Sequence, residues 1–341
     1  MNKIKPILAV TMGDPAGIGP EIAAKLFASD SVYQNSFPVL VGHTEVMKKA
    51  ISLLKLDLAI NAIKEIESAR FEPGIMNIFE VESPEAELIK FGEVSAAAGD
   101  LAFRSVTKAI ELAMERKVDG TVTGPIHKES INKAGHKFAG HTEIYAHYTG
   151  TKKYAMLLVE ENFKVIHVST HVSLRQACDL VKKDRVLEVI QLMNDGLKKL
   201  KIENPRIGVA GLNPHASDGG LFGTEDTEEI LPAIIAAREL GIDAHGPIAP
   251  DTLYAMAYGG KYDGCVAMYH DQGHIPFKVI GFNWDQKSGK MKSVKGVNVT
   301  MGLPIIRTSV DHGTAFEIAG KGVASPDALF HAIEYAEKLA N

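Results

Sequence analysis

Three histidines share one sequence context, in which an apolar strand ends and an imidazole follows. Imidazole is a common ligand of zinc and related divalent ions, and a catalytic site keeps three protein ligands and one open position. A single histidine at a strand end is more often a hydrogen-bonded structural residue, whereas three of them indicate a divalent-metal site. The three candidates are His171 in Ser169-Thr-His-Val-Ser, His215 in Leu212-Asn-Pro-His-Ala, and His270 in Tyr269-His-Asp-Gln.

The third histidine lies in a stretch that also offers an anion binder. Cys265–Tyr269 reads as a buried strand, after which Gln272 and Gly273 are expected to turn the chain toward Lys278. Open α/β sheets bind ligands at the carboxyl ends of their strands. The stretch therefore predicts an anionic substrate held partly by a metal. Two carboxylates, Asp251 and Asp271, would either orient a ligand imidazole or cap loops.

Further polar residues are candidates for binding an anion. Arginine grips a carboxylate or phosphate with two hydrogen bonds, and lysine acts as a point charge. The alternative to anion binding is that Thr142 belongs to the start of a helix at Ile144–Tyr148. For lysine and arginine the alternative is that they are solvated surface cations. The candidates are His141, Thr142, Lys278, Asn298 and Arg307.

A glycine-rich loop, Met12–Glu21, follows the first predicted strand. Its glycines would admit a phosphate to the N–H groups at a helix N-terminus, although a tight strand-to-helix turn explains them as well. The loop matches neither the dinucleotide fingerprint nor the P-loop.

Apolar strands alternate with helical segments along nearly the whole chain. This alternation predicts βαβ units and a largely parallel sheet covered on both faces. Helices are expected over Pro20–Ser29 and along the apolar stripe from Ala97 to Ala113. The expected strands are Pro6–Met12, Gly120–Thr123, Val165–Ser169, Ile207–Leu212 and Cys265–Tyr269.

Length and composition narrow the class of protein. The 341 residues favour two α/β lobes, and the net charge of -5 argues against nucleic-acid binding. No apolar run approaches the ~20 residues of a membrane span, and Met1–Pro6 lacks the plan of a secretory signal, so a cytoplasmic protein is expected. Cys178 and Cys265 are expected to be two buried thiols without a disulfide.

A polar stretch, Asn283–Lys295, has the character of an insertion. It turns around Ser288–Gly289 and carries four lysines, which predicts either a solvated surface hairpin or a lid over a phosphate. The lysines are Lys287, Lys290, Lys292 and Lys295.

Two longer segments bring in a family resemblance. Gly13–Glu21 and Asp311–Gly322 resemble the opening segment and the adenosine-binding loop of the isocitrate and isopropylmalate dehydrogenases. The match is closer to the PdxA family, the 4-hydroxythreonine-4-phosphate dehydrogenases of pyridoxal phosphate synthesis. It is carried by Gly140–Glu143, Gly211–Ala216, Pro250–Leu253, Met268–Gly273 and Ile306–Thr314.

The resemblance implies an α/β, two-lobed isocitrate/isopropylmalate dehydrogenase-like fold with parallel and mixed sheets and an active-site cleft between the lobes. We place the first lobe at 1–130 plus 305–341 and the second, with dimer contacts, at 131–304. A homodimer is implied, in which the partner subunit supplies one metal ligand.

The resemblance also implies residue roles. His171, His215 and His270 take the positions of the ligands to zinc, magnesium, manganese or cobalt, and the five anion-binding candidates take the substrate positions. Lys278 and Asp251 are the expected catalytic residues, with Lys278 neutralising developing charge or moving a proton. NAD or NADP would be held by Gly13, Asp14, His312, Gly313, Thr314 and Ala315.

The implied reaction is NAD-dependent, metal-assisted oxidation and decarboxylation of a 4-phosphorylated 3-hydroxy acid. The expected substrate is 4-hydroxy-L-threonine 4-phosphate. Two departures from biosynthetic members are the long 283–295 stretch and His274-Ile-Pro. They resemble a sister branch that acts on D-threonate or D-erythronate 4-phosphate, and this alternative would give dihydroxyacetone phosphate. A zinc phosphoesterase and a non-catalytic sugar-phosphate sensor are the rival classes.

Overall fold

The computed structural model of the chain describes residues 5–281, 283–286, 290–292 and 296–341. The chain forms two compact units. Unit 1 comprises Met1–Lys152 and Leu303–Asn341, and unit 2 comprises Lys153–Gly302.

Unit 1 is built on a parallel sheet with the strand order β3-β4-β2-β1-β5-β14. Its strands are β1 (Ile7–Thr11), β2 (Phe37–Gly42), β3 (Ala59–Ile63), β4 (Ile75–Glu80), β5 (Gly120–Thr123) and β14 (Arg307–Val310). Its helices are α1 (Gly19–Phe27), α2 (Thr44–Leu54), α3 (Ala96–Met114), α4 (Lys128–Lys133), α5 (His141–Tyr148) and α11 (Asp327–Ala340), with single turns η1 (Asp30–Tyr33), η2 (Ile66–Ser68) and η3 (Ala86–Leu88).

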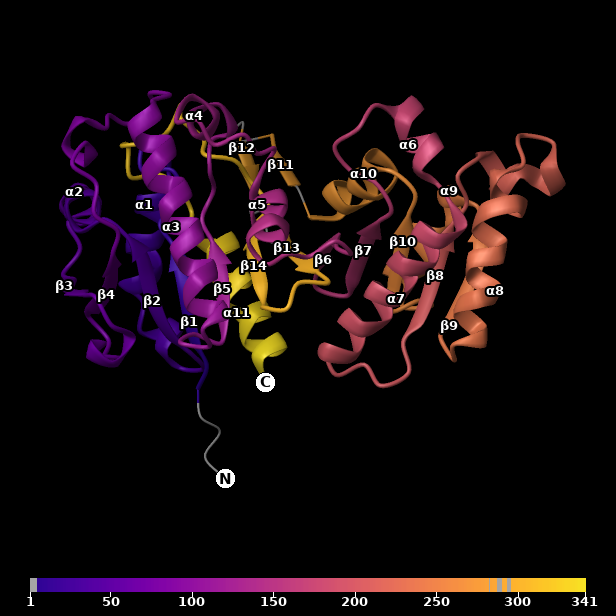
Figure 1. Cartoon of the computed structure of the whole chain (residues 1–341), viewed down its shortest axis with the longest axis horizontal. Coiled ribbons are helices and arrows are strands. Elements are labelled where there is room, and N and C mark those ends of the chain that lie inside the picture. The colour runs from indigo at the N-terminus through magenta and orange to yellow at the C-terminus, as the bar shows by residue number, and fades with distance from the viewer. Residues whose placement is uncertain (1–4, 282, 287–289, 293–295) are drawn as a thin grey trace. The chain divides into compact units, whose positions relative to one another are not determined.

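The direction of the crossovers places helices on both faces of this sheet. The chain moves from β1 to β2 in one direction along the sheet and from β4 to β5 in the other. Because such crossovers are right-handed, α1 and α3 must cover opposite faces. In Figure 1, α3 lies in front of β1, β2 and β5, which it contacts. The predicted parallel α/β construction is therefore confirmed in unit 1.

Residues 131–152, which we expected in the second lobe, belong to unit 1 in the structure. Helices α4 and α5 pack against α3 and complete one of its apolar clusters. The cluster joins Phe103, Val106 and Ile110 of α3 to Ile131, Ile144 and Tyr145.

Unit 2 has a mixed sheet with the order β13-β6-β7-β10-β8-β9, in which β13, β6 and β7 pair antiparallel and the other pairs are parallel. Its strands are β6 (Ala155–Glu160), β7 (Phe163–His167), β8 (Arg206–Ala210), β9 (Asp243–Ile248), β10 (Gly264–Ala267) and β13 (Val297–Met301). Its helices are α6 (Leu174–Leu180), α7 (Lys183–Lys199), α8 (Leu231–Glu239), α9 (Pro250–Tyr258) and α10 (His270–Gly281), with turns η4 (Pro214–Gly220) and η5 (Asp226–Ile230).

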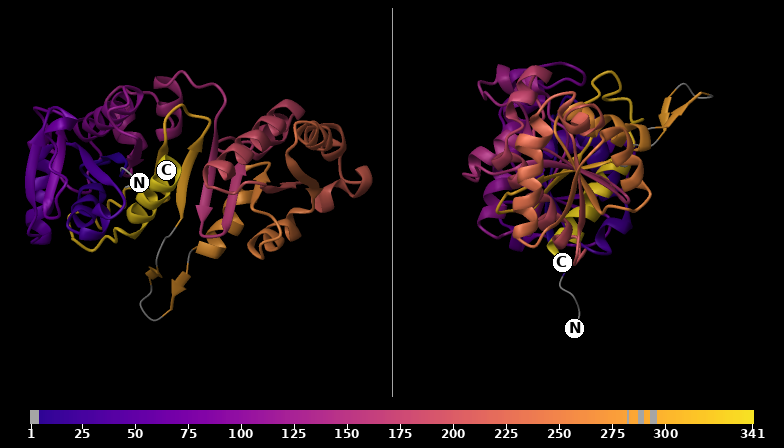
Figure 2. Two further views of the ribbon diagram at one scale, coloured as in Figure 1. Left: turned by 90° about the horizontal axis from the view of Figure 1, so that it is seen from below. Right: turned by 90° about the vertical axis from the view of Figure 1, so that its right-hand side faces the viewer.

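Helices also cover the sheet of unit 2, whose strands fan out with the usual twist (Figure 2, right). Helix α7 contacts β6, β7, β8, β10 and β13. Helices α9 and α10 contribute Leu253, Tyr254 and Phe277 to a core cluster with Phe163 of β7 and Cys265 of β10. The predicted α/β fold with parallel and mixed sheets is thus confirmed.

The expected turn at Gln272 and Gly273 is wrong, because both residues lie inside α10. The amide of Gln272 ties this first turn of the helix to two strand ends: it accepts from the N–H of Met268 at 2.6 Å and donates to the carbonyl of Gly211 at 2.7 Å. Gly273 serves close packing, since a Cβ there would lie 2.4 Å from Nε2 of His167.

The 283–295 stretch contains a two-stranded antiparallel pair, β11 (Asn283–Asp285) and β12 (Lys290–Lys292). This agrees with the expected hairpin. The predicted turn at Ser288–Gly289 and the lysines Lys287 and Lys295 lie outside the described residues.

Both cysteines are free, as expected. Cys265 is buried, and burial raises the pKa of its thiol. Cys178 is only half-buried, contrary to expectation, because it lies on the short helix α6, of whose seven residues only Ala177 is buried.

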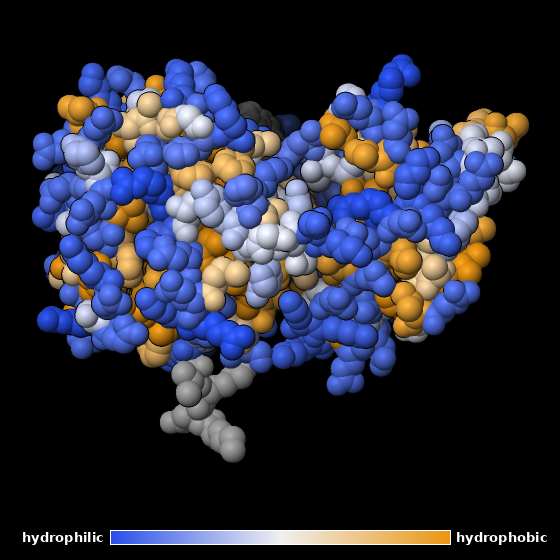
Figure 3. Space-filling view, viewed as in Figure 1, coloured by the Kyte–Doolittle hydropathy of each residue, from blue (hydrophilic) through white to orange (hydrophobic). Residues whose placement is uncertain are grey.

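The surface seen in Figure 3 is mainly hydrophilic, with hydrophobic side chains scattered among the polar ones. Among the described residues, no helix is both long and apolar enough to span a membrane.

Candidate functional site

The two segments expected to hold a cofactor lie against each other in unit 1. The N–H of Ile18, at the start of α1, donates to the carbonyl of Thr314 at 3.0 Å. The N–H of Gly320 donates to Oε1 of the buried Glu21 at 2.6 Å. Glu21 and Gly320 are 299 positions apart in the sequence, yet these bonds make the two segments one structural feature. We call it the glycine-loop pair, Gly13–Glu21 with Asp311–Gly322.

Asp14 is a buried carboxylate within the glycine-loop pair. Its Oδ1 accepts from the N–H of Ala16 at 2.9 Å, and its own N–H donates to the carbonyl of Pro125 at 2.8 Å. Burial raises the pKa of Asp14, although the Ala16 bond opposes the shift. Its Oδ2 is buried and makes no hydrogen bond of good geometry among the described residues, although the Ser130 side chain lies close enough to lower the pKa of Asp14. Gly13 allows this geometry, because its φ is +77° and a Cβ would lie 2.6 Å from the Pro125 carbonyl.

The other predicted cofactor residues lie on the second segment. His312 is bonded through Nδ1 to the carbonyl of Gly313 at 2.9 Å. Thr314 is buried, and Ala315 has a left-handed φ of 43°. The Phe316 ring that follows stacks on His127 at 4.6 Å between centroids, which attaches this loop to the start of α4.

A buried cation lies beside an imidazole elsewhere in unit 1. Arg307 is the first residue of β14 and only 2% exposed, and its Nη2 donates to Oγ1 of Thr123 at 2.9 Å. Burial lowers the pKa of Arg307 to about 10, while Tyr145 and Glu143 oppose the shift. The guanidinium therefore stays charged at neutral pH.

The charge of Arg307 acts on His141, the first residue of α5. Burial lowers its pKa well below the ordinary value, and the charge of Arg307 adds to the effect. Its Nε2 is buried and has no hydrogen-bond partner among the described residues. A buried cation beside a neutral imidazole with an unsatisfied nitrogen is suited to an anionic group that also carries a hydroxyl or an acidic proton. Thr142 follows on the same first turn of α5.

The remaining two substrate candidates belong to unit 2. Lys278 is half-buried near the end of α10, and Asn298 is half-buried on β13 opposite Leu158 of β6. Oδ1 of Asn298 is buried without a hydrogen-bond partner among the described residues. Asp251 lies exposed on the first turn of α9.

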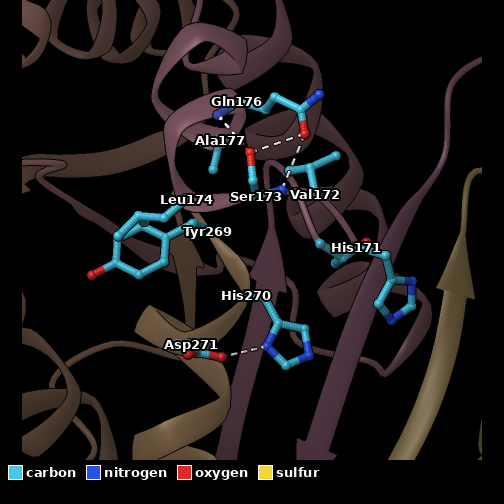
Figure 4. A pocket seen from close by; sticks show the side chains of 10 residues that line it. His171, Val172, Ser173, Leu174, Gln176, Ala177, Tyr269, His270 and Asp271 are labelled. Atoms are coloured by element: carbon cyan, nitrogen blue, oxygen red, sulfur yellow. Dashed lines mark hydrogen bonds and ion pairs between the residues drawn. The ribbon is translucent and has the colours of Figure 1, made fainter.

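Two of the three predicted metal ligands come together in unit 2. The rings of His171, in the loop after β7, and His270, at the start of α10, have centroids 5.9 Å apart. Nδ1 of His270 is 2.7 Å from Oδ1 of Asp271, which leaves Nε2 of His270 available as a ligand atom. Both histidines line a cavity of about 500 Å³ together with Ser173, Gln176 and Tyr269 (Figure 4).

The third predicted ligand, His215, is exposed on the turn η4. Residues 215–219 all have a left-handed φ. The buried Asp226 holds this turn by accepting four hydrogen bonds, from Leu212 N, Asn213 N, Asn213 Nδ2 and Ser217 Oγ, at 2.5–3.2 Å. Within the described part of this single chain, no three His, Cys, Asp or Glu side chains form a group that could hold a metal ion.

We next compared the sequence and the structure with those of known proteins. The family model described as "Pyridoxal phosphate biosynthetic protein PdxA" matches residues 34–336. The chain belongs to the PdxA family.

Relatives of this PdxA-family chain match it over nearly its full length. A D-threonate 4-phosphate dehydrogenase from Pectobacterium atrosepticum is 45% identical over 335 residues, which cover 98% of this chain and 99% of that protein. One from Salmonella typhimurium is also 45% identical, with 98% of each chain covered. The crystal structure of a 4-hydroxythreonine-4-phosphate dehydrogenase from Klebsiella pneumoniae has a TM-score of 0.87 at 42% identity and covers 99% of this chain and 100% of that one. This PdxA-family chain is accordingly a dehydrogenase.

In each unit the structure adds residues around the candidate site that sequence reasoning did not assign. Thr123 and Tyr145 contact Arg307, and Asp226 holds the His215 turn. His167 ends β7 and lies next to His274 of α10. A signal for His167 was present, because it is a histidine at the end of an apolar strand, as the three predicted ligands are.

Proposed function

We propose that this chain oxidises and decarboxylates D-threonate 4-phosphate with NAD. The observation that carries the proposal is the buried Arg307 beside the unsatisfied Nε2 of His141, which is suited to an anionic substrate. The names of the curated relatives support this choice of substrate, since relatives that are 39–45% identical over nearly the whole chain carry the name D-threonate 4-phosphate dehydrogenase, some of them with a qualifying prefix.

The proposed reaction has two steps. In the first, the C3 hydroxyl loses its proton while C3 loses a hydride to NAD, which gives a 3-keto acid and NADH. In the second, the C1–C2 bond breaks, carbon dioxide leaves, and a proton is added at C2. The products are dihydroxyacetone phosphate, carbon dioxide and NADH. Negative charge develops on the C3 oxygen in the second step, and cationic groups near it lower the barrier.

Each candidate residue takes a role in this proposal. Arg307 and His141, with Thr142, bind an anionic group of the substrate, and Asn298 adds an amide contact. Lys278 neutralises the charge that develops during decarboxylation. Asp251 orients a ligand imidazole. For Lys278 we prefer charge neutralisation over proton transfer, because an ammonium group acts as a point charge beside a developing anion.

The glycine-loop pair fits the proposed NAD. Oδ2 of Asp14 and Oε2 of Glu21 are buried acceptors that make no hydrogen bond of good geometry among the described residues, and ribose hydroxyls or an amide would satisfy such atoms. Gly13, Asp14, His312, Gly313, Thr314 and Ala315 would hold the cofactor, which supplies the hydride acceptor when bound.

The histidine cluster of unit 2 fits a divalent metal in part. His171 and His270 would supply two ligands, and Asp271 would orient His270. His215 would complete the set in a homodimer whose partner subunit supplies one ligand. The ion, whether zinc, magnesium, manganese or cobalt, polarises the substrate hydroxyl and carbonyl when bound.

The second candidate substrate is 4-hydroxy-L-threonine 4-phosphate, which differs from D-threonate 4-phosphate in carrying an amino group at C2. It is favoured by the Klebsiella pneumoniae structure, which covers 99% of this chain and bears the name of the dehydrogenase for this substrate. D-erythronate 4-phosphate, which has the opposite configuration at one carbon, is a variant of the first proposal.

The test is to follow NADH absorbance with the purified protein, a divalent metal and each of the three 4-phosphorylated acids in turn. We expect the highest kcat/KM for D-threonate 4-phosphate, with dihydroxyacetone phosphate as product. A higher kcat/KM for 4-hydroxy-L-threonine 4-phosphate would overturn the choice of substrate. Release of inorganic phosphate without NADH would instead indicate the rival phosphoesterase. Binding that survives metal removal, without turnover of any acid, would indicate the sensor.

A further inference from the structure

Three imidazoles form a column behind the cavity of unit 2. The rings of His270 and His274 are stacked, with centroids 3.6 Å apart and an interplanar angle of 11°. The ring of His167 lies 4.6 Å from that of His274. His270 and His274 are four residues apart on α10, so they share one face of the helix. The column thus connects a predicted metal ligand to the interior of the unit.

The inner end of the column is firmly held. His167 is 1% exposed, and its Nδ1 is 3.3 Å from the carbonyl of Met156 on β6. Gly273 lets α10 approach it, because any Cβ at this position would lie 2.4 Å from Nε2 of His167. His274 therefore packs on a ring that is itself part of the core.

The hydrogen bonds of the column define which nitrogen of each ring carries hydrogen. Nδ1 of His274 is 3.0 Å from the carbonyl of His270, and Nδ1 of His270 is 2.7 Å from a carboxylate oxygen of Asp271. Because both partners are acceptors, each Nδ1 must be the donor. Nε2 of His270 then carries no hydrogen and has a free lone pair, as a metal ligand requires.

The stacking separates the roles of the two rings. Lone pairs lie in the ring plane, and with the centroids 3.6 Å apart and the planes only 11° apart, the lone pairs of the two rings lie in separate, nearly parallel planes. Such lone pairs do not converge on one ion, so His274 is unsuited to share a metal with His270. Its flat face instead restricts the rotation of the His270 ring.

We infer that His274 is a positioning residue that holds the His270 imidazole in the orientation needed for the divalent metal. The inference rests on the proposed function, which makes His270 a metal ligand. It gives a physical role to a histidine that the metal, substrate and cofactor assignments leave unused. Residues that orient a metal ligand typically change metal affinity by 10–100-fold when they are replaced.

The experiment measures Co²⁺ and Zn²⁺ affinity of the full-length apoprotein by calorimetry, with the Co²⁺ absorption spectrum as a second readout. His274→Leu removes the flat ring, and we expect a loss of affinity of about tenfold or more and an altered Co²⁺ spectrum. His274→Phe keeps a flat ring without the Nδ1 donor, and we expect affinity within a few-fold of wild type. Ile275→Ala is the matched control, because Ile275 is 61% exposed on the same helix.

His270→Ala distinguishes a failure of the positioning role of His274 from a failure of the metal site itself. If His270→Ala lowers the affinity and His274→Leu does not, the positioning role is overturned while the metal site stands. If His270→Ala binds metal as wild type does, the metal assignment fails and the positioning role fails with it. Equal losses in His274→Leu and His274→Phe would overturn stacking as the cause. Circular dichroism and thermal unfolding of each variant exclude a general loss of fold.

Discussion

The guanidinium of Arg307 lies over the ring of Tyr145, with Cζ 5.7 Å from the ring centroid, in the interior of unit 1. Burial strengthens this cation–π contact, because water does not compete for the charge. Arg307 also donates to Thr123, so one side chain joins β14, β5 and α5. Burial raises the pKa of Tyr145 to about 12, so the phenol stays neutral beside the cation.

Replacing Arg307 should weaken substrate binding. Arg307→Ala removes a charge-assisted contact, so we expect a loss of about 1.5–3 kcal/mol of substrate binding. Arg307→Lys keeps the charge but not the paired hydrogen bonds, and should lose less. Steady-state kinetics with NADH detection would measure both. Unchanged KM and kcat in Arg307→Ala would contradict the assignment.

Replacing Tyr145 tests the ring separately from the hydroxyl. Tyr145→Leu removes the aromatic face beneath Arg307 and should weaken substrate binding by up to about 2 kcal/mol. Tyr145→Phe keeps the ring and should bind substrate almost as wild type does. Isothermal titration with the substrate would show the difference, and equal effects of the two changes would exclude the cation–π contact as the cause.

Replacing Asp226 should loosen the turn that carries His215. Asp226→Asn replaces a carboxylate that accepts four hydrogen bonds with an amide, whose NH2 group cannot accept any. We therefore expect a loss of about 1–3 kcal/mol in the free energy of unfolding. Metal affinity should fall too if His215 is a ligand. Urea unfolding measures the first effect, and calorimetry measures the second. Asp218→Asn, an exposed change on the same turn, is the control and should alter neither.

The stability of unit 2 should fall in mild acid. Burial lowers the pKa of His167 to about 3, helped by the nearby His274. The unfolded chain binds a proton at this residue below about pH 6.5, while the folded chain does not. His167 should therefore reduce the free energy of unfolding by up to about 1.4 kcal/mol per pH unit between those two pKa values, and cost nothing above pH 7.

The measurement is urea unfolding of the apoprotein at several pH values from 7 to 5, compared with His167→Gln. Glutamine does not titrate, so the variant should lose stability less steeply as the pH falls. Parallel curves for the two proteins would show that His167 does not contribute to the acid sensitivity.

Local patterns in the chain determined the elements and much of the chemistry. Strand β5 was predicted with its exact bounds, and the apolar stripe from Ala97 to Ala113 became α3. These features depend on neighbouring residues, because side-chain periodicity and turn residues act over a few positions. The strand-end histidines were visible for the same reason, and the long motifs pointed to the family.

Tertiary structure decided which distant groups meet. Arg307 contacts Tyr145, Asp226 holds the turn of His215, and His167 packs on His274, all between different elements. No local pattern records such pairs, since they arise from strand order and helix packing. The expected turn at Gln272 failed for that reason: the side-chain bond from Gln272 to Gly211 crosses from α10 to the end of β8 and stabilises a helix where the local residues favour a turn.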